Sequence, residues 1–464
     1  MLQPVIGLEV HAQLLTRTKI FCPCPTTFGA APNTQVCPVC LGLPGALPSL
    51  NRAVVELAIR AGKAFGCRIS ERSIWSRKNY FYPDLPKGYQ ISQFELPICA
   101  GGEVDVPGLR KIALTRIHLE EDAGKSVHGE AGSQVDLNRS GVPLIEIVGQ
   151  PELRSSEEAS EYLKALRLAL IYLGVNDGNL EEGSFRCDAN VSVHEPGAPL
   201  GTRVELKNIN SFRFVRQAID FETARQVAAL ARGERIVQET RLYDHQKNET
   251  RAMRSKEEAN DYRYFPEPDL PPLTVSRAWI DAVQVPRLPN EITAALLAAG
   301  VSPADARTIV SDPRLSALHA RLSDPRRAAH FVVGELSRAL NDGAVTLDAL
   351  AFEPAQVAEV WALQDGGTLS STGAKEVLAE LVRSGKPPAQ IVQERGLAQV
   401  SDSAALEAVV DAVIARFPSE VSKYRAGKKN LLGFLVGAAM KELKGKGNPG
   451  ALNALFLKRL DGPA

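Results

Sequence analysis

The chain has 464 residues, of which 44% are hydrophobic and 23% charged, and its formal net charge is zero. This composition predicts an ordinary globular protein of about three domains with a large core. A balanced charge excludes a global field that attracts nucleic acid or membrane, so polyanion binding would require local patches.

Three further features indicate the compartment. No apolar run reaches the roughly 18 residues of a membrane span, and no basic segment followed by an apolar one opens the chain. Seven cysteines, four of them in one cluster, fit a reducing compartment better than a disulfide framework. We therefore expect a cytoplasmic protein with no membrane partner.

The first predicted element is a strand over residues 5–14. Its period-two pattern places the apolar residues on one face and Glu9, His11 and Gln13 together on the other. A carboxylate and an imidazole side by side on a strand, next to a cysteine-rich loop, indicate a catalytic platform.

The cysteine-rich loop follows this strand. It contains the pairs Cys22 and Cys24, and Cys37 and Cys40, within a segment rich in proline and threonine. Four thiolates at this spacing can close a tetrahedral zinc site, and four sulfur ligands leave no open position. The pattern predicts structural zinc; the alternative is four reduced cysteines without a ligand.

Two helices interrupt the strands of the first 290 residues. One runs from about Arg52 to Phe65, and the other begins after Ser155, which forms a capping-box pattern with Glu158, and stops at Gly174. The predicted strands are 111–121, 142–148, 185–193 and 202–208. Strands in a row with inserted helices predict an α+β fold with a largely antiparallel sheet.

The segment 77–90 combines aromatic and charged residues in one proline-bounded loop. Its aromatic side chains could stack a base or line a passage. A loop held by buried tyrosines explains the pattern equally well.

Charged residues recur on several predicted strands. On single faces lie Glu9 with His11, Arg186 with Asp188, and Glu205 with Lys207; Glu146 is the one charge of its strand, and Glu120, Glu121 and Asp122 are three consecutive acids. Oxygen ligands suit Mg²⁺ bound with nucleotide phosphates, and basic residues nearby would neutralise phosphate charge. One such strand alone is typical of a solvated sheet face, but their recurrence favours a binding site. The glycine patterns at 124–126 and 445–450 fit neither familiar phosphate loop.

A proline-rich segment at 266–272 ends the strand-rich region, and the chain beyond about 290 is predicted to be helical. A second change in composition falls near residue 400. The last segment is basic, which suits RNA phosphates or a solvated helix face. The predicted domains are residues 1–290, 291–400 and 401–464, the last two entirely helical.

At this point the sequence resembles the B-subunit family of bacterial aspartyl/glutamyl-tRNA(Asn/Gln) amidotransferases. The resemblance extends over essentially the whole chain and rests on long motifs. They are residues 7–11, 37–45, 77–90, 119–125, 183–190, 261–270, 433–437 and 444–449.

The resemblance implies a cradle-shaped catalytic domain, a helical domain and a small helical tail that binds tRNA. It implies ATP-dependent phosphorylation of the side-chain carboxylate of Glu-tRNA(Gln) or Asp-tRNA(Asn), followed by amidation with ammonia. A glutaminase A subunit would supply the ammonia through a tunnel, and a small C subunit would clasp the assembly.

The resemblance also assigns roles to individual residues. Magnesium and catalytic positions are Glu9, His11, Glu121 and Glu146, with Glu120, Arg186, Asp188 and Glu205 as further candidates for the same pocket. Lys78, Asp84 and Lys87 correspond to the ammonia passage, and Cys22, Cys24, Cys37 and Cys40 to the zinc site. From their charge, the tail lysines Lys428, Lys429, Lys441, Lys444 and Lys446 are candidates for tRNA binding.

Two other functions remain open at this level: a non-catalytic tRNA-binding scaffold, and a stand-alone ATP-dependent carboxylate ligase. The sequence contains no cysteine in a nucleophile setting and no Ser-Lys amidase pattern. Because it lacks a glutaminase motif of its own, the ammonia is expected to come from a partner subunit. The sequence does not distinguish Glu-tRNA(Gln) from Asp-tRNA(Asn) as the substrate.

Overall fold

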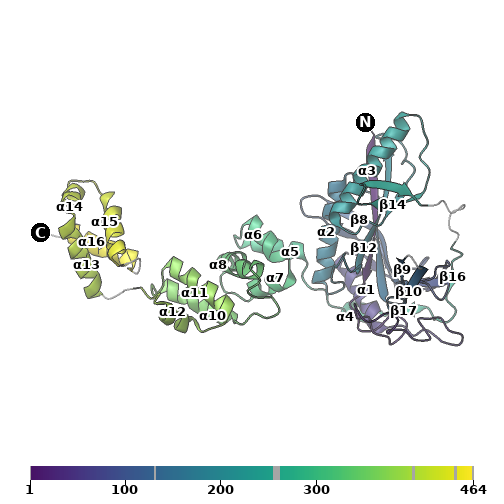
Figure 1. Cartoon of the computed structure of the whole chain (residues 1–464), viewed down its shortest axis with the longest axis horizontal. Helices are drawn as coiled ribbons and strands as arrows, with labels where there is room; N and C mark the ends of the chain where they lie inside the picture. Colours follow the sequence, from purple (N-terminus) through teal and green to yellow (C-terminus); the bar gives the residue numbers. More distant parts are fainter. Residues whose placement is uncertain (1, 130–131, 254–261, 400–402, 444–446, 462–464) are drawn as a thin grey trace. The chain divides into compact units, whose positions relative to one another are not determined.

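The computed structural model describes residues 2–129, 132–253, 262–399, 403–443 and 447–461. The chain divides into two compact units, Met1–Glu291 and Ile292–Ala464. The first contains a large sheet with helices, and the described part of the second is helical (Figure 1). The prediction of an α+β fold with a largely antiparallel sheet followed by helical regions is confirmed.

A sheet of 13 strands organises the described part of the first unit. Its strands are β1 Gln3–Gln13, β2 Arg68–Ile69, β4 Ser76–Asn79, β5 Tyr89–Ser92, β6 Cys99–Ala100, β7 Glu103–Asp105, β8 Lys111–Glu121, β11 Pro143–Gly149, β12 Phe185–His194, β13 Val204–Lys207, β14 Thr240–Asp244, β15 Glu249–Ala252 and β16 Phe265–Pro266. The main path is β15-β14-β13-β12-β1-β11-β8-β5-β4-β16. The pair β13–β14 is parallel, and the other neighbours on this path are antiparallel.

Two short ladders lie outside this sheet. They are β9 Lys125–Gly129 with β10 Gly132–Asp136, and β3 Arg72–Ser73 with β17 Leu273–Thr274. The first ladder and its flanking turns lie close to the cysteine-rich loop, because Asn33 donates a hydrogen bond to the carbonyl oxygen of Val135 (2.9 Å).

The helices of the first unit are α1 Arg52–Ala64, α2 Ser156–Tyr172, α3 Phe212–Ala231 and α4 Arg277–Ala282. In Figure 1, α1, α2 and α3 lie against one face of the sheet. The apolar residues of the central strands, such as Leu8, Val10 and Ile145, are buried in the same core as these helices. The polar residues of the same strands alternate with them and therefore point to the opposite face.

The two predicted helices are confirmed to within one residue at each end. Asn51 caps α1 by accepting from Ala53, and Ser155 caps α2 by accepting from Glu158 (3.1 Å). The reciprocal half of the expected capping box is replaced, since the Glu158 carboxylate accepts from the backbone of Arg154 (2.9 Å). The 20-residue helix α3 was not predicted, because charged residues interrupt its apolar pattern as far as Arg225.

The second unit contains the helices beyond the proline-rich segment. They are α5 Pro289–Ala298, which begins at the end of the first unit, α6 Pro303–Val310, α7 Pro313–Ala320, α8 Pro325–Phe331, α9 Ser337–Asn341, α10 Pro354–Asp365, α11 Ser371–Ser384, α12 Pro388–Arg395, α13 Ser403–Arg416, α14 Pro418–Arg425, α15 Leu431–Glu442 and α16 Pro449–Asp461. A π-helical turn, η1 Val332–Leu336, joins α8 to α9. Helices α13–α16 enclose an apolar cluster of their own.

The predicted boundary between a helical domain and a tail, at residues 400 and 401, lies outside the described residues. The division into three domains therefore stays a prediction. Among the described helices, none has both the length and the apolar character needed to cross a membrane.

Candidate active site

Four neighbouring strands form a row of polar side chains across the sheet. His118 on β8 lies opposite Glu146 on β11, Glu146 lies opposite His11 on β1, and His11 lies opposite Arg186 on β12. Directly opposite residues of an antiparallel pair project to the same face. The register therefore brings two imidazoles, a carboxylate and a guanidinium together from segments far apart in sequence.

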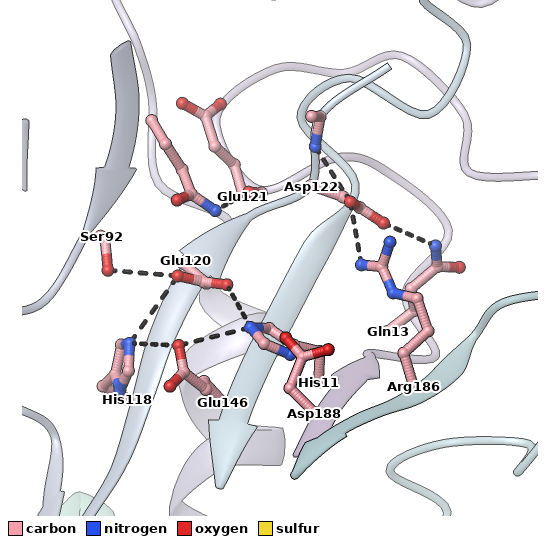
Figure 2. Close-up of polar contacts among 12 residues, drawn as sticks. His11, Gln13, Ser92, His118, Glu120, Glu121, Asp122, Glu146, Arg186 and Asp188 are labelled. Atoms are coloured by element: carbon pink, nitrogen blue, oxygen red, sulfur yellow. Dashed lines mark hydrogen bonds and ion pairs between the residues drawn. The ribbon is translucent and has the colours of Figure 1, made fainter. Parts of the chain in front are cut away.

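Glu120, two residues after His118, completes a compact cluster with this row (Figure 2). The His11 Nε2 lies 3.4 Å from Glu146 and 3.5 Å from Glu120, while the His118 Nε2 lies 3.3 Å from Glu146 and 3.7 Å from Glu120. The Ser92 hydroxyl lies 3.4 Å from Glu120. We call His11, Glu120 and Glu146 the carboxylate–histidine centre.

The geometry of the carboxylate–histidine centre suits a metal ion. One ligand atom from each of its three residues lies within 4.8 Å of the others. The side chain of Glu120 is 3% exposed, whereas that of His11 is 22% exposed, so the centre is reachable from one side. Two carboxylates and one imidazole leave coordination positions for water or phosphate oxygens, as Mg²⁺ requires.

The electrostatics of the cluster reflect close packing of opposite charges. Burial lowers the pKa of His11, but the hydrogen bond and charge of Glu146 more than offset it, so its pKa lies above the usual value. For His118, burial is likewise outweighed by Glu146 and Glu120, which raise its pKa to about 9. Burial raises the pKa of Glu146, and the two histidines bring it well below its usual range. In the absence of a metal, the neighbouring carboxylates therefore favour the protonated form of both imidazoles.

A second polar group continues along β1, β12 and β13. The Glu9 carboxylate accepts from Asn190 (3.0 Å), and Lys207 donates to Asp188 (2.7 Å) and lies 3.0 Å from Glu205. Burial, followed by the charges of Glu146, Glu205 and Asp188, raises the pKa of Glu9. These predicted residues therefore share one polar face with the carboxylate–histidine centre.

Arg186 forms an ion pair with the buried Asp122 just after the end of β8. The Arg186 Nη2 donates to Asp122 (3.0 Å), Gln13 donates to the second oxygen (2.9 Å), and Arg139 lies 3.6 Å away. Burial raises the pKa of Asp122, but the charges of Arg186 and Arg139 outweigh burial, so it lies below the usual value. This carboxylate holds the Arg186 guanidinium beside His11.

Glu121 lies away from the carboxylate–histidine centre. Its carboxylate forms an ion pair with Lys87 and accepts from the backbone of Ile91 (2.9 Å). Glu121 and Lys87 line a cavity of about 170 Å³ together with Cys40, Gly42 and other residues of the cysteine-rich loop. The four residues expected to share magnesium, Glu9, His11, Glu121 and Glu146, are thus not gathered around one point, and Glu120 takes the place expected for Glu121.

The residues expected at the ammonia passage lie on either side of this region. The Lys78 Nζ lies 4.8 Å above the Tyr262 ring, and Lys87 lies beside Glu121. Burial lowers the pKa of Lys78, but the charges of Glu120 and neighbouring groups raise it above the usual value. The backbone carbonyl of Asp84 accepts from Gly124 (2.8 Å), which joins the 77–90 loop to the end of β8.

The four predicted cysteines converge on one point. Their Sγ atoms lie within 4.8 Å of one another, and those of Cys37 and Cys40 lie 3.9 Å apart. Tetrahedral zinc with Zn–S bonds of about 2.3 Å requires sulfurs about 3.8 Å apart, so the donor set fits the ion. The hydrogen bond with Cys22, then the Cys37 amide and Lys19, lowers the pKa of Cys40 to about 4. We call these four residues the cysteine centre.

The tail lysines lie on the exposed surface of the second unit, as far as the structure describes them. Lys428 and Lys429 lie between α14 and α15, and Lys441 lies in the last turn of α15. Lys429 is paired with Asp461 (2.6 Å). Lys444 and Lys446 lie outside the described residues.

Two residues of this region were not among the predicted site residues: His118 and Lys19. Asp122 was expected on the polar strands, but its pairing with Arg186 was not. His118 could have been found, because it lies two residues before Glu120 and so shares its face. Asp122 pairs with Arg186, 64 residues away, and Lys19 contacts Gln35, Cys40 and Leu137, which are 16, 21 and 118 residues away; no local pattern indicates these contacts.

Comparison with known proteins places these features in a family. A family model described as the GatB/GatE catalytic domain matches residues 4–281, and one described as the GatB domain matches residues 315–460. The first contains the carboxylate–histidine and cysteine centres.

The matches to similar proteins cover nearly the whole chain. The B subunit of the aspartyl/glutamyl-tRNA(Asn/Gln) amidotransferase from Anaeromyxobacter sp. (strain Fw109-5) is 58% identical, and the match covers 99% of each chain. The B subunits of the same name from Myxococcus xanthus and Geotalea uraniireducens are 56% and 52% identical, over 99% of this chain and at least 98% of theirs. The resemblance seen in the sequence is confirmed, and the chain belongs to the family of aspartyl/glutamyl-tRNA(Asn/Gln) amidotransferase B subunits.

Proposed function

We propose that this chain phosphorylates the side-chain carboxylate of Glu-tRNA(Gln), Asp-tRNA(Asn) or both with ATP, and then converts it to the amide with ammonia. The observation that carries the proposal is the carboxylate–histidine centre, His11, Glu120 and Glu146, within the segment matched by the catalytic-domain family. The names of the relatives supply the tRNA substrates.

The chemistry requires activation because a carboxylate does not react with ammonia at neutral pH. One oxygen of the substrate carboxylate attacks the γ-phosphorus of ATP, and the bond to ADP breaks. The ammonia nitrogen then attacks the acyl carbon, phosphate leaves with its bonding electrons, and the nitrogen loses a proton to give the amide. The main demand on the protein is positioning and charge stabilisation.

The polar face supplies groups for both demands. His11, Glu120 and Glu146 would hold Mg²⁺, which when bound supplies charge neutralisation for the nucleotide phosphates. Arg186 and Lys207 are cations held in place by Asp122 and Asp188 on the same face. The raised pKa of Glu9 suits a group that can carry or release a proton beside the reacting carboxylate.

The source of ammonia in this proposal is a partner. A glutaminase A subunit would hydrolyse glutamine, and a small C subunit would complete the assembly. Lys78, Asp84 and Lys87 would guide ammonia to the polar face. The cysteine centre would hold structural zinc, since all four positions around the ion are taken by sulfur.

The test is an amidation assay with the purified full-length chain. Mg²⁺, ATP, ammonium chloride and either Glu-tRNA(Gln) or Asp-tRNA(Asn) are supplied, with and without the A and C partners, and amidated aminoacyl-tRNA is measured. We expect an ATP-dependent product from free ammonia that Glu120→Gln abolishes. Product that depends on the partners when glutamine replaces ammonia would locate the glutaminase elsewhere.

The alternatives predict different results. A tRNA-binding scaffold would bind tRNA but consume no ATP, and Glu120→Gln would leave the turnover of the assembly unchanged. A stand-alone carboxylate ligase would consume ATP and ammonia with a small carboxylic acid and without tRNA. Either result contradicts the proposed function.

A further inference from the structure

Lys19 is a lysine whose side chain is completely enclosed by protein. It has 0% exposure, and its ammonium group donates to the carbonyl oxygens of Gln35 (2.7 Å) and Leu137 (3.4 Å) and lies 3.7 Å from the Cys40 sulfur. Within the described residues, no carboxylate oxygen lies within 4.0 Å of its Nζ, in contrast to the buried Lys87 beside Glu121. Lys19 therefore lacks the usual partner of a buried cation.

Burial of an ammonium group among neutral hydrogen-bond acceptors alone is unfavourable in free energy. Its removal from water costs several kcal/mol, so buried lysines normally face a negative charge. The group that faces Lys19 is the cysteine centre. A divalent ion with four thiolate ligands carries a net double negative charge, and one ammonium at 3.7 Å from a ligand sulfur halves it.

We propose that Lys19 is the built-in counter-cation of the cysteine centre and that its positive charge stabilises the metal-loaded form. The inference rests on the proposal that the centre holds zinc. Groups that surround metal ligands tune metal affinity, and their loss typically reduces it by about 10- to 100-fold. Lys19 acts through the thiolates and touches no reacting atom of the proposed reaction, so it is a positioning residue.

A purely mechanical role is the competing explanation. By donating to Gln35 and Leu137, Lys19 also ties the cysteine-rich loop to the segment after β10. A mechanical tie stabilises the protein equally with and without metal. A counter-cation stabilises it more when the centre carries more negative charge, and the loaded centre with four thiolates carries more than the stripped centre, in which the Cys40 thiolate remains.

The experiment compares zinc-loaded full-length wild-type protein with Lys19→Met and Lys19→Gln. Methionine keeps the length of the side chain, and glutamine keeps a donor for the carbonyls while removing the charge. Lys63→Met is the matched control, because Lys63 also donates to three backbone carbonyls, of Ile280, Asp281 and Val283, remote from the cysteines. Zinc release to a coloured chelator is followed, and urea unfolding is measured in the loaded and stripped reduced forms.

We expect both Lys19 variants to release zinc about 10-fold faster than wild type or more, and Lys63→Met to release it at the wild-type rate. In the zinc-loaded form the Lys19 variants should unfold at lower urea than wild type. In the stripped form this difference should be smaller, because only the Cys40 thiolate remains to face Lys19. Lys63→Met should lower the urea midpoint equally in both forms.

Two results would overturn the inference. The first is that both Lys19 variants release zinc at the wild-type rate. The second is that they lose equal stability in the loaded and stripped forms, which would show that Lys19 is only a mechanical tie. A wild-type protein that retains no zinc would instead contradict the zinc assignment itself. If Lys19→Met does not fold in either form, the zinc release of Lys19→Gln decides.

Discussion

Glu120 and Glu121 are adjacent at the end of β8, yet their carboxylates point to opposite sides of the sheet (Figure 2). Glu120 lies 3.5 Å from the His11 imidazole, whereas Glu121 is paired with Lys87 beside the cysteine-rich loop. The alternation of side chains along a strand enforces this division. The carboxylate–histidine centre and the cavity next to the cysteine centre are therefore lined by consecutive residues of one strand.

This arrangement predicts that Glu120→Gln and Glu121→Gln behave differently. Glu120→Gln removes a charged oxygen ligand from the carboxylate–histidine centre, and we expect about a 10- to 100-fold weaker affinity for Mn²⁺ used as a probe for Mg²⁺. Glu121→Gln should leave Mn²⁺ affinity within about twofold of wild type, because its carboxylate faces Lys87. Calorimetric titration of the full-length protein with Mn²⁺ measures both.

The two variants control for each other, because each removes one buried negative charge from the same strand. Equal loss of Mn²⁺ affinity in both, or loss in Glu121→Gln alone, would contradict the placement of the metal at Glu120.

The strand pattern predicts much of this site and misses the rest for identifiable reasons. Period two correctly separates Leu8 and Val10 from Glu9 and His11, and it recurs in β8, β11 and β12. It cannot establish which strands are neighbours, and the row His118–Glu146–His11–Arg186 depends on that order. Two consecutive acids also look alike in sequence, although alternation allows only one of them to face the metal.

The pair Asp122–Arg186 predicts a dependence of stability on pH. The pKa of Asp122 is lower in the folded protein than in the unfolded chain, so its charge stabilises the fold above the unfolded pKa of about 3.9. That contribution is lost as the pH falls through the folded pKa. Asp122→Asn should reduce the free energy of unfolding by about 1–3 kcal/mol at neutral pH, since it leaves Arg186 without its buried charge partner.

The difference in free energy of unfolding between wild type and Asp122→Asn is measured by urea unfolding. The measurement is repeated from neutral pH down to the lowest pH at which the protein stays folded. The two curves should converge at the acid end, where wild-type Asp122 also becomes neutral. Asp281→Asn is a suitable control, because the side chains of Asp281 and its ion-pair partner Arg277 are both largely exposed. A constant difference between Asp122→Asn and wild type at all pH values would contradict the ionic role.

The cysteine centre predicts a local effect of metal removal. Its loop has few apolar residues of its own, so bound zinc, on the order of 10–16 kcal/mol for structural zinc sites, would hold it in place. After chelation, or in Cys37→Ser, the amides of Leu41 and Gly42, which donate within the Cys37–Cys40 turn, should exchange with deuterium faster.

Amides of β1, which pair with β11 and β12, should keep their protection in the same experiment. Hydrogen exchange followed by mass spectrometry, with and without zinc, reports both segments. Unchanged exchange in the loop after chelation would contradict a structural role for metal in the cysteine centre.

The tail lysines predict unequal effects on tRNA binding. Lys428 has no ion pair within the described residues, whereas Lys429 is neutralised by Asp461 at 2.6 Å and lies 4.2 Å from the Tyr424 ring. Lys428→Ala should therefore weaken tRNA binding more than Lys429→Ala, and it should lower the slope of log affinity against log salt by about 1.

The control for general charge loss is Lys164→Ala, because Lys164 is an exposed lysine of α2 in the first unit. Filter binding of tRNA at several salt concentrations gives the slopes. Equal slopes for Lys428→Ala and Lys164→Ala would remove Lys428 from the tRNA contact, because a phosphate contact releases a counterion that a remote lysine does not.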